Sequence, residues 1–437
     1  MTVGYLTFGR DDLCYGLEVV KREIEASGHK CYRVTPKTAR CCDVLIFSVF
    51  WWEHIFVLAD WLRKAGIDKK QSNRPRLIAG GFCTFNPVPI LQYVDAVVVG
   101  DGEDITLAAV NGDYSGKSVL CEGKQVVEWN NSPTLKPICH ETNNIARIEL
   151  SRGCRCRCRF CAVAHLKPYR EASIEDIEAC LRSTKQKRVS LFAPEPTMHS
   201  RDDDITMLCR RLGKTRQDSD VRLDRLSHRS DSVPRVGIEG LSERLRKSVN
   251  KGYSNEKIIE EVREAIKAGR KGIFMYMILD LPGECEDDWL EFRELLTRIG
   301  EIPGADKFLL KPSPSVFMPT PHTPMSGDEI HWEREYGNKW ESFFGRGDDR
   351  DWEVLMAERS RVFSPHMRLL SMMATRGGEE FRKVESTLSK QGYIAISAGR
   401  PVVRAKQMME QVFDKNGLFE LYCGKRENGP WNIVKML

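Results

Sequence analysis

The stretch SRGCRCRCRFCAV, Ser151 to Val163, places four cysteines within eight residues of a chain of 437. It follows an apolar run, Ala146 to Ser151, that has the length of a buried β-strand. Three of the four cysteines, Cys154, Cys158 and Cys161, fit the pattern CxxxCxxC. Thiolates at this spacing can hold an iron–sulfur cube, and three protein ligands on four irons leave one iron open. The spacing therefore favours a catalytic metal site over a closed structural one.

The fourth cysteine of the stretch, Cys156, leaves two alternatives open. Four thiols could bind zinc, or four thiolates could hold a ferredoxin-like electron-transfer centre. The sequence has no second CxxC or HxxxH pair to complete an ordinary zinc site. Side chains one residue apart on a tight loop point away from each other, so we interpret Cys156 as a bystander. The four arginines between the cysteines either lower the thiol pKa or form a solvated basic loop: Arg152, Arg155, Arg157 and Arg159.

The composition indicates a soluble chain of about three domains, at ~150 residues per domain. Hydrophobic residues make up 41% and no apolar run approaches the ~18 residues of a membrane span. The N-terminus lacks the pattern of a signal peptide, so we expect a cytoplasmic protein with no membrane segment. The 67 basic and 62 acidic residues give a net charge of +5, which leaves RNA binding open but unsupported. Fifteen cysteines, about 3% of the chain, are too few for a disulfide scaffold.

Residues 1–112 alternate between apolar runs and amphipathic segments, which predicts a Rossmann or flavodoxin-like domain. Continuous apolar strands are typical of a parallel sheet that helices cover on both faces. Ligands are expected where such strands end, and glycines mark several of these ends. The expected strands are Val3 to Phe8, Asp43 to Phe50, Arg76 to Gly81 and Asp95 to Glu103, and the expected helices are Leu17 to Ser27 and Ile55 to Ala65.

Residues 113–144 are polar and without sustained periodicity, which predicts a linker. A second alternating series over 145–326 predicts a partial (β/α)6 TIM barrel. Residues 327–437 are rich in charged and aromatic side chains and are expected to form a mostly helical C-terminal region. In the barrel, Ser254 and Gly269 mark the ends of a helix from Asn255 to Ala268. The six expected barrel strands are Ala146 to Ser151, Arg188 to Ala193, Val221 to Ser227, Arg235 to Gly240, Gly272 to Pro282 and Lys307 to Pro312.

With these features together, the chain resembles the radical S-adenosylmethionine enzymes. In that family the CxxxCxxC loop follows the first strand of a partial TIM barrel, and an aromatic residue, here Phe160, precedes the last cysteine. The resemblance implies a 4Fe–4S cluster on Cys154, Cys158 and Cys161. It also implies that S-adenosylmethionine chelates the open iron and is cleaved reductively to a 5′-deoxyadenosyl radical.

Later segments resemble the family in the expected order. LFAPEPT, 191–197, lies where the family contacts the methionine amino group, so the resemblance implies a role for Glu195. GIEGLSERLRKSVNKGYS, 237–254, resembles the fourth-strand segment that ends in an asparagine–lysine pair. There the resemblance implies that Glu239, Ser242 and Arg244 face the ribose and the methionine carboxylate. MILDLPGECEDD (277–288) and SVFMPTPHTPM (315–325) resemble the fifth-strand and sixth-strand motifs, the former with Asp280 where glycine is usual.

The N-terminal domain resembles the cobalamin-binding module that precedes many radical S-adenosylmethionine domains. The resemblance rests on IAGGFCTFNPVP, 78–89, and VDAVVVGDGED, 94–104, and it implies that Gly80, Gly81 and Gly100 admit the ligand closely. In the module's motif D-x-H-x-x-G, this chain has Asp11, Leu13 and Gly16. Leucine cannot ligate cobalt, so a bound cobalamin would lack this histidine. His54 and Cys14 are further polar candidates, although a histidine within WWEHIF is more often a packed side chain.

A methylthiotransferase is the main alternative, because that branch holds a second cluster on three N-terminal cysteines. Cys14 and Cys83 fall near two of the three expected strand ends, but the strand Asp43 to Phe50 is followed by none. More broadly, the alternative is tRNA modification by a radical S-adenosylmethionine enzyme. A non-catalytic iron–sulfur electron-transfer protein is the remaining alternative.

The leading hypothesis is a cobalamin-dependent radical S-adenosylmethionine methyltransferase that acts on an unactivated carbon. Its cofactors would be the 4Fe–4S cluster, S-adenosylmethionine and cobalamin, which carry the chemistry while the protein orients them. The modest net charge favours a peptide, protein or small-molecule substrate over RNA. A flavodoxin or ferredoxin is the expected electron donor.

Overall fold

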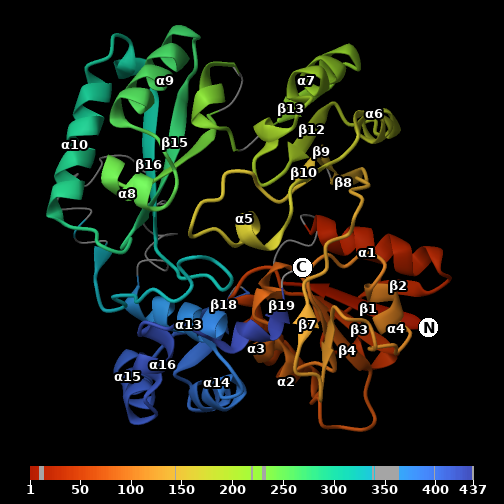
Figure 1. Ribbon diagram of the computed structural model, residues 1–437. Helices are drawn as coiled ribbons and strands as arrows, with labels where there is room; N and C mark the ends of the chain where they lie inside the picture. Colours follow the sequence, from red (N-terminus) through yellow and green to blue (C-terminus); the bar gives the residue numbers. More distant parts are fainter. Residues whose placement is uncertain are drawn as a thin grey trace.

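The computed structural model describes residues 1–8, 14–142, 144–217, 220–228, 233–336, 339, 364–397 and 399–435. Three groups of elements follow one another along the chain: an N-terminal sheet with its helices, a central pair of sheets, and a group of C-terminal helices (Figure 1). The α/β class predicted from the sequence is confirmed, and the described residues of the C-terminal region are mostly helical, as predicted. No helix among the described residues is both long and apolar enough to cross a membrane.

The N-terminal sheet has six strands in the order β2-β1-β3-β4-β5-β6, of which the first five are parallel and β6 is antiparallel to β5. The order of the parallel strands is that of the flavodoxin-like folds, with the topological switch between β1 and β3. The strands are β1 Thr2–Thr7, β2 Lys30–Arg33, β3 Val44–Ser48, β4 Arg76–Gly80, β5 Ala96–Val98 and β6 Val119–Cys121. The helices are α1 Tyr15–Ala26, α2 His54–Ala65, α3 Val88–Leu91 and α4 Thr106–Val110.

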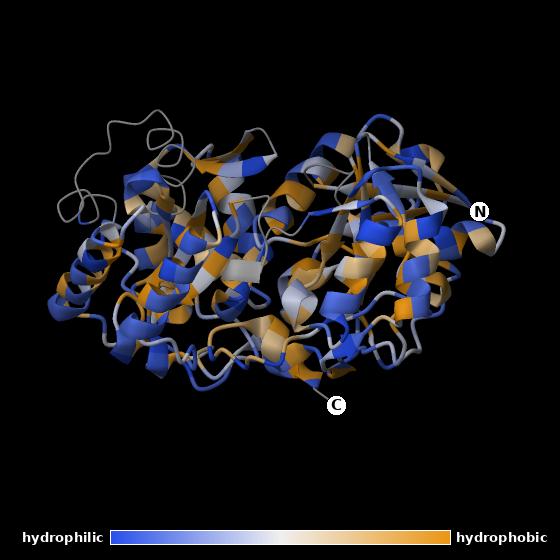
Figure 2. Cartoon of the chain, turned by 90° about the horizontal axis from the view of Figure 1, so that it is seen from above, coloured by the Kyte–Doolittle hydropathy of each residue, from blue (hydrophilic) through white to orange (hydrophobic). Residues whose placement is uncertain are grey.

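Strand β3 explains why this sheet is buried on both faces. Val44 and Ile46 belong to the hydrophobic cluster that includes Ile24 of α1, whereas Leu45 and Phe47 belong to the cluster of α2. Successive side chains of a strand point to opposite faces, so a continuous apolar run supplies both helical layers. The helices, in contrast to this strand, carry both hydrophilic and hydrophobic residues (Figure 2).

The described residues of the central region form six parallel strands, divided between two sheets. Sheet β13-β12-β9-β8 holds the first three, with β8 antiparallel at its edge, and sheet β14-β15-β16 holds the other three. The strands are β8 His140–Thr142, β9 Ile145–Glu149, β12 Arg188–Phe192, β13 Thr215–Gln217, β14 Arg235–Glu239, β15 Gly272–Leu279 and β16 Leu309–Val316. The helices are α5 Ala162–Leu166, α6 Ile174–Ser183, α7 Asp202–Arg211, α8 Glu243–Ser248, α9 Asn255–Lys267 and α10 Glu286–Gly300, and β10 Ser151–Arg152 pairs with β11 Arg170–Glu171.

One predicted barrel strand is wrong. Residues 221–227 do not form a strand; Leu223–His228 is a 3₁₀-helix, and the third strand is β13, which lies earlier in the chain. Leu223 and Leu226 are both fully buried. Residues three apart lie on the same side of a 3₁₀-helix, so this helix buries both leucines together. In a strand the two side chains would point to opposite faces. The helix expected from Asn255 is confirmed as α9, with the Ser254 hydroxyl accepting from Lys257 N at 3.1 Å.

The C-terminal helices pack against the N-terminal unit. Figure 1 shows α13 and α14 beside α2 and α3 of that unit. Arg63 of α2 donates two hydrogen bonds to Glu385, at 3.0 and 2.9 Å. Asn86 donates to the carbonyl oxygens of Thr375 and Gly377. The elements are α13 Pro365–Arg376, α14 Phe381–Lys390, β17 Ile394–Ser397, β18 Arg400–Val403, α15 Lys406–Lys415, α16 Leu418–Cys423 and β19 Val434–Lys435, the last paired with β7 Val127–Glu128.

Candidate active site

The cysteine loop, residues 153–161, connects β10 to α5. Gly153 has a φ of 75°, and a Cβ there would lie 2.5 Å from the carbonyl oxygens of Lys167 and Pro168, so the first turn of the loop requires glycine. Arg157, at the middle of the loop, also has a positive φ of 51°. The loop ends at Cys161, which is the residue before the first turn of α5.

The loop rests on the segment 248–253 between α8 and α9. Arg159 N donates to the Val249 carbonyl at 3.1 Å. The side-chain amide of Asn250 donates to the carbonyls of Cys156 and Arg157, at 3.2 and 3.1 Å. The backbone of the loop is thus held by residues that lie about 90 positions later in the chain.

Sulfur atoms gather on the inner side of the loop. The thiols of Cys154 and Cys156 lie 3.9 and 3.8 Å from Sδ of Met198, and Cys158 is buried. Among the residues that the structure describes, no three Cys, His, Asp or Glu side chains already converge on one point, so holding a cluster requires the thiols to turn toward each other. Thiolate ligands are the donor set of iron–sulfur clusters, and three of them on one short loop fit a 4Fe–4S cluster.

Burial and neighbouring groups shift the pKa values of these thiols in opposite directions. Burial raises the pKa of Cys158 to about 11. The pKa of Cys156 is lowered to about 6, first by a hydrogen bond from Cys154 and then by the cations of Arg222 and Lys251, against the effect of burial. Arg222 Nη1 lies 3.5 Å from the Cys156 thiol. This side of the loop therefore carries the positive charge that ionised thiolates need.

Two of the predicted carboxylates share this charged environment. Glu239, at the end of β14, has a φ of 71°, and its Oε1 lies 3.4 Å from Lys251 Nζ. Burial raises the pKa of Glu239, and Lys251 partly offsets the effect. Burial also raises the pKa of Glu195, against hydrogen bonds from Thr197 N and Oγ1 at 3.3 and 2.6 Å and the cations of Lys251 and Arg222.

Gly237 makes room for the carboxylate of Glu239, because a Cβ at position 237 would lie 2.2 Å from Glu239 Oε1. Phe160 packs, partly buried, against the main hydrophobic core. Gly237 thus leaves space for a carboxylate near the cysteine loop, and Phe160 anchors the loop to the hydrophobic core.

Ser242 and Arg244 both contact Asp288 of α10. The Ser242 hydroxyl accepts from Leu245 N at 3.2 Å as the N-cap of α8 and donates to Asp288 of α10. Arg244 donates to Asp288 at 2.5 Å and to the Gly283 carbonyl at 2.9 Å. These contacts join α8 to α10, and Lys251 is brought to the cysteine loop together with Asn250 and Arg222.

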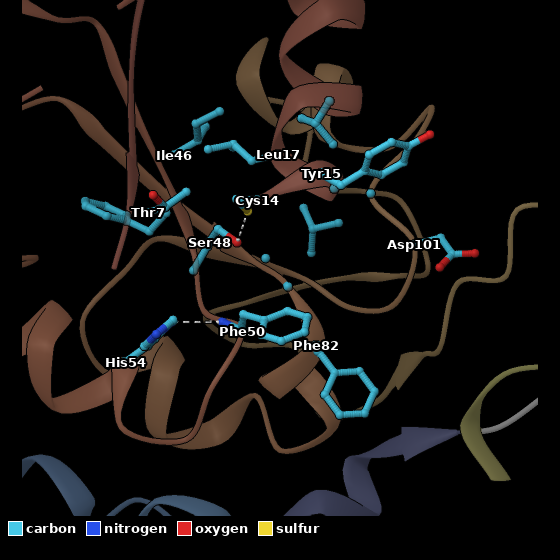
Figure 3. Close-up of a pocket in the computed structure, with 18 of the residues that line it drawn as sticks. Thr7, Cys14, Tyr15, Leu17, Ile46, Ser48, Phe50, His54, Phe82 and Asp101 are labelled. Carbon is cyan, nitrogen blue, oxygen red and sulfur yellow. Dashed lines mark hydrogen bonds between the residues drawn. The ribbon is translucent and has the colours of Figure 1, made fainter. Parts of the chain in front are cut away.

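A cavity of about 1080 Å³ lies at the carboxyl edge of the N-terminal sheet. Its walls include the ends of β1, β3, β4 and β5, as expected at the switch point of such a sheet (Figure 3). Four of the predicted glycines line it: Gly16, Gly80, Gly81 and Gly100. The other wall comes from the central region and the β17–β18 hairpin: Arg147, Glu149, Arg152, Lys167, Phe192, Gly399 and Arg400.

The backbone requires glycine at two of these cavity positions but not at a third. Gly81 and Gly100 have φ values of 114° and 95°, and a Cβ at either would lie within 2.7 Å of the backbone of Val49 or Asn130. Gly80 has no such constraint, because its Cβ would meet only ordinary contacts, the nearest at 3.7 Å. At Gly80 a side chain would therefore fit the backbone but take space from the cavity.

His54 and Cys14 both line the cavity, and both have partners. The Cys14 thiol lies 3.3 Å from the Ser48 hydroxyl (Figure 3). Nδ1 of His54 accepts from Phe50 N at 3.2 Å and from Trp51 N at 3.4 Å. A neutral imidazole that accepts at Nδ1 carries its proton on Nε2, and burial lowers the pKa of His54 to about 4. His54 thus matches the packed side chain expected within its aromatic run.

The remaining N-terminal candidates are Asp11, Leu13 and Cys83. Asp11 and Leu13 lie outside the described residues. Cys83 is buried, and its thiol donates to the Phe50 carbonyl at 3.2 Å. Burial raises the pKa of Cys83 above its ordinary value.

A buried ionic network joins the cavity to the cysteine loop. The carboxylate of Asp101, 1% exposed, contacts Lys167 at 2.9 Å, Arg170 at 2.9 Å and Arg152 at 3.3 Å. Arg152 also binds Glu149 at 2.9 Å and precedes Cys154 by two residues. Burial would raise the pKa of Asp101, but the cations of Lys167, Arg152 and Arg170 outweigh it and hold the pKa well below its usual value.

Sequence reasoning assigned no role to Lys251 or to the Asp101 network. The asparagine–lysine pair at 250–251 was a usable signal, because both residues contact or face the cysteine loop. Asp101 gave a weaker signal, as an acidic residue directly after a buried strand and a glycine.

Comparisons with known proteins agree with this arrangement. The radical SAM superfamily model matches residues 148–296, and a model of the N-terminal part of radical SAM proteins matches residues 20–120. Two proteins of Methanocaldococcus jannaschii are similar to this chain. The uncharacterized protein MJ0966 is 25% identical over 290 residues, 60% of this chain, and the proposed methylthiotransferase MJ0865 is 27% identical over 293 residues, 58% of this chain. The match spans 64% of the length of each.

Among solved structures, the chain is similar to OxsB, a cobalamin-dependent S-adenosylmethionine radical enzyme. The apo form matches with a TM-score of 0.53 and 13% identity, over 99% of this chain and 82% of that one. The form with aqua-cobalamin bound gives a TM-score of 0.52 at the same identity and coverage. At this identity the likeness shows the fold. The two family models, over residues 20–120 and 148–296, together with the cysteine loop, show that the chain belongs to the radical S-adenosylmethionine superfamily, whose cofactors are a 4Fe–4S cluster and S-adenosylmethionine.

Proposed function

We propose that this protein is a cobalamin-dependent radical S-adenosylmethionine methyltransferase that methylates an unactivated carbon of a peptide, protein or small molecule. The observation that carries the proposal is the cavity of about 1080 Å³ between the flavodoxin-like sheet and the central region. Ordinary ligand pockets measure about 300–1,000 Å³, so this cavity has room for a large ligand. OxsB, which has a similar fold, binds cobalamin in its solved structure.

The walls of the cavity suit a corrinoid without a histidine ligand from this part of the chain. Gly80 and Gly81 leave backbone open to the ligand. His54 presents a protonated Nε2, because its Nδ1 is already an acceptor, and a protonated nitrogen has no lone pair for cobalt. We therefore expect any cobalamin here to bind without ligation by His54.

The cavity also reaches the start of the cysteine loop. Arg152 lines the cavity and is separated from Cys154 by one residue. The bound cofactors would supply hydrogen abstraction from carbon and a transferable methyl group. The chain itself would bind and orient them: the loop cysteines hold the cluster, Glu195, Glu239 and Lys251 give a polar environment beside it, and the buried Asp101 network holds the two walls together.

The second candidate is a methylthiotransferase or another tRNA-modifying enzyme. It is favoured by the similarity to the proposed methylthiotransferase MJ0865. The N-terminal thiols argue against a second cluster, because the buried Cys83 donates to a backbone carbonyl and Cys14 contacts the hydroxyl of Ser48. Iron content equal to two clusters, or sulfur in the product, would support this candidate instead.

The test is the visible absorption spectrum of anaerobically reconstituted protein with and without added hydroxocobalamin, after removal of unbound ligand. We expect bound corrinoid together with the iron of one cluster. Gly80→Phe should abolish corrinoid binding and keep the cluster, because the ring would fill the cavity. The control is Gly300→Phe at the exposed end of α10, where a Cβ meets nothing within 4 Å. Corrinoid-free wild-type protein, or equal binding by Gly80→Phe, would contradict the proposal.

A further inference from the structure

The outer side of the cysteine loop carries three exposed arginines. Arg155, Arg157 and Arg159 are exposed, whereas the cysteines between them are buried or half-buried. Side chains therefore alternate along the loop, with sulfur on the inner side and guanidinium on the outer side. We call these three arginines the arginine face.

Each end of the arginine face is held by the surrounding structure. The Arg155 guanidinium lies 4.1 Å from the ring centroid of Tyr169, and 3.4 Å from the half-buried Glu171. Arg159 Nη1 donates to the Ser248 carbonyl at 3.1 Å. These contacts order long side chains that would otherwise lose conformational entropy when a partner binds.

The arginine face differs from Arg152 in its exposure and in its carboxylate partners. Arg152, the fourth arginine of the stretch, is 11% exposed and saturated by Asp101, Glu103 and Glu149. The outer three are exposed and alternate along the loop with the cysteines that would hold the cluster, and Arg155 shares the single half-buried carboxylate of Glu171. Adjacent Cα atoms are only about 3.8 Å apart, so a protein bound to the arginine face would lie close to those thiols.

We propose that the arginine face is the docking surface for an acidic one-electron carrier protein that reduces the cluster. The inference rests on the cluster assignment at Cys154, Cys158 and Cys161, and it does not require cobalamin. In the reaction the reduced carrier loses one electron and the cluster gains one, with no exchange of atoms. Complementary charge steers such encounters and raises association rates by about 10- to 1,000-fold at low salt.

An acidic protein fits this surface better than RNA does. The arginine face is a single short loop, and the whole chain carries a net charge of only +5. A nucleic-acid interface spreads many phosphate contacts over a broad basic surface. A small basic patch over a redox centre suits a brief contact that ends after electron transfer.

The test compares the wild type with the triple variant Arg155→Gln, Arg157→Gln, Arg159→Gln. The probes are an acidic flavodoxin and, separately, titanium(III) citrate as a small chemical reductant. Two quantities are measured anaerobically: the dissociation constant of oxidised flavodoxin as a function of salt, and the rate of cluster reduction by each reductant. The control variant is Arg182→Gln, Arg210→Gln, Arg211→Gln, which removes three exposed arginines from α6 and α7.

We expect the triple variant to bind flavodoxin at least tenfold more weakly at low salt and to lose most of the salt dependence. Its cluster should be reduced at least tenfold more slowly by flavodoxin and within twofold of the wild-type rate by titanium(III) citrate. The control variant should match the wild type in all three measurements. The single variant Arg157→Gln, which spares the contacts of Arg155 and Arg159, should show the same effect at smaller size.

Three outcomes would overturn the inference. Unchanged flavodoxin binding would show that the arginine face is not the docking surface. Equal slowing with titanium(III) citrate would show damage to the loop instead of lost docking. Loss of RNA binding with unchanged flavodoxin kinetics would assign the surface to a nucleic acid. Failure of the proposed function is distinguishable, because absence of bound corrinoid leaves each of these measurements intact.

Discussion

The ammonium of Lys251 lies 3.4 Å from Oε1 of Glu239, in a partly closed space beside the cysteine loop. The Lys251 and Glu239 side chains are 18% and 15% exposed. Burial opposes the charge of Lys251, but Glu239 and the thiols of Cys158 and Cys156 raise its pKa above the ordinary value. This single cation therefore balances a carboxylate and the thiols at the same time.

Replacing Lys251 with methionine should weaken both the fold and the cofactor site. A carboxylate left without its partner in a buried position costs about 3 kcal/mol. We expect this loss in the free energy of unfolding, measured in urea, and at least tenfold weaker binding of S-adenosylmethionine, measured by equilibrium dialysis. The double variant Lys251→Met, Glu239→Gln should recover most of the stability but not the affinity. A double variant as unstable as the single one would refute the pairing.

The cysteines of the loop should differ sharply in their importance. Cys158→Ala and Cys154→Ala should lose the cluster, because two thiolates cannot hold it in place. Cys156→Ala, a change of the same size one position away, should retain wild-type iron content and an electron paramagnetic resonance signal that responds to S-adenosylmethionine. Iron analysis and that spectrum decide the matter. A cluster that persists in Cys154→Ala and vanishes in Cys156→Ala would reassign the ligand set.

Asp101→Asn should loosen the contact between the N-terminal sheet and the central region. Its loss leaves Lys167, Arg152 and Arg170 with less compensating charge in a buried place, which costs about 3–5 kcal/mol. We expect lower stability in urea together with faster hydrogen exchange at 167–170. Asp95→Asn breaks the ion pair with Arg74 inside the N-terminal unit and should lower stability without that faster exchange. Equal exchange at 167–170 in both variants would contradict the assignment.

His54 should contribute a pH dependence to stability. The folded protein keeps His54 neutral down to its lowered pKa of about 4, whereas the unfolded chain binds a proton below about 6.5. The unfolded state thus binds more protons between these values, so the contribution is complete above pH 6.5 and is lost toward pH 4. Its size is about 3 kcal/mol. Unfolding measured from pH 4 to 7 checks this.

The control for that measurement is His54→Asn, whose side-chain oxygen can accept from Phe50 N but cannot titrate. Its stability should fall less steeply than that of the wild type over the same pH range. Identical curves for the wild type and His54→Asn would show that this histidine does not contribute.

Local patterns in the sequence predicted most of the elements and the cysteine loop. The continuous apolar run of β3 predicted a strand buried on both faces, and Ser254 predicted the start of α9. Both depend on neighbours within a few residues, which a sequence displays directly. The predicted strand at 221–227 was wrong because the local pattern there is ambiguous. Val221 and Leu223 alternate as in a strand, whereas Leu223 and Leu226 are three apart as on one side of a 3₁₀-helix. In the structure both leucines are buried on a 3₁₀-helix.

The sequence by itself determined which chemistry this protein carries, because the spacing CxxxCxxC and the glycines at strand ends are local properties of the chain. The tertiary structure decided which side chains surround that chemistry. It brought Lys251 to the cysteine loop and Asp101 to Arg152, and it joined Ser242 and Arg244 to Asp288. The physical reason is that charged and polar side chains pair where strand ends and helix ends meet in space. No spacing along the chain records those meetings.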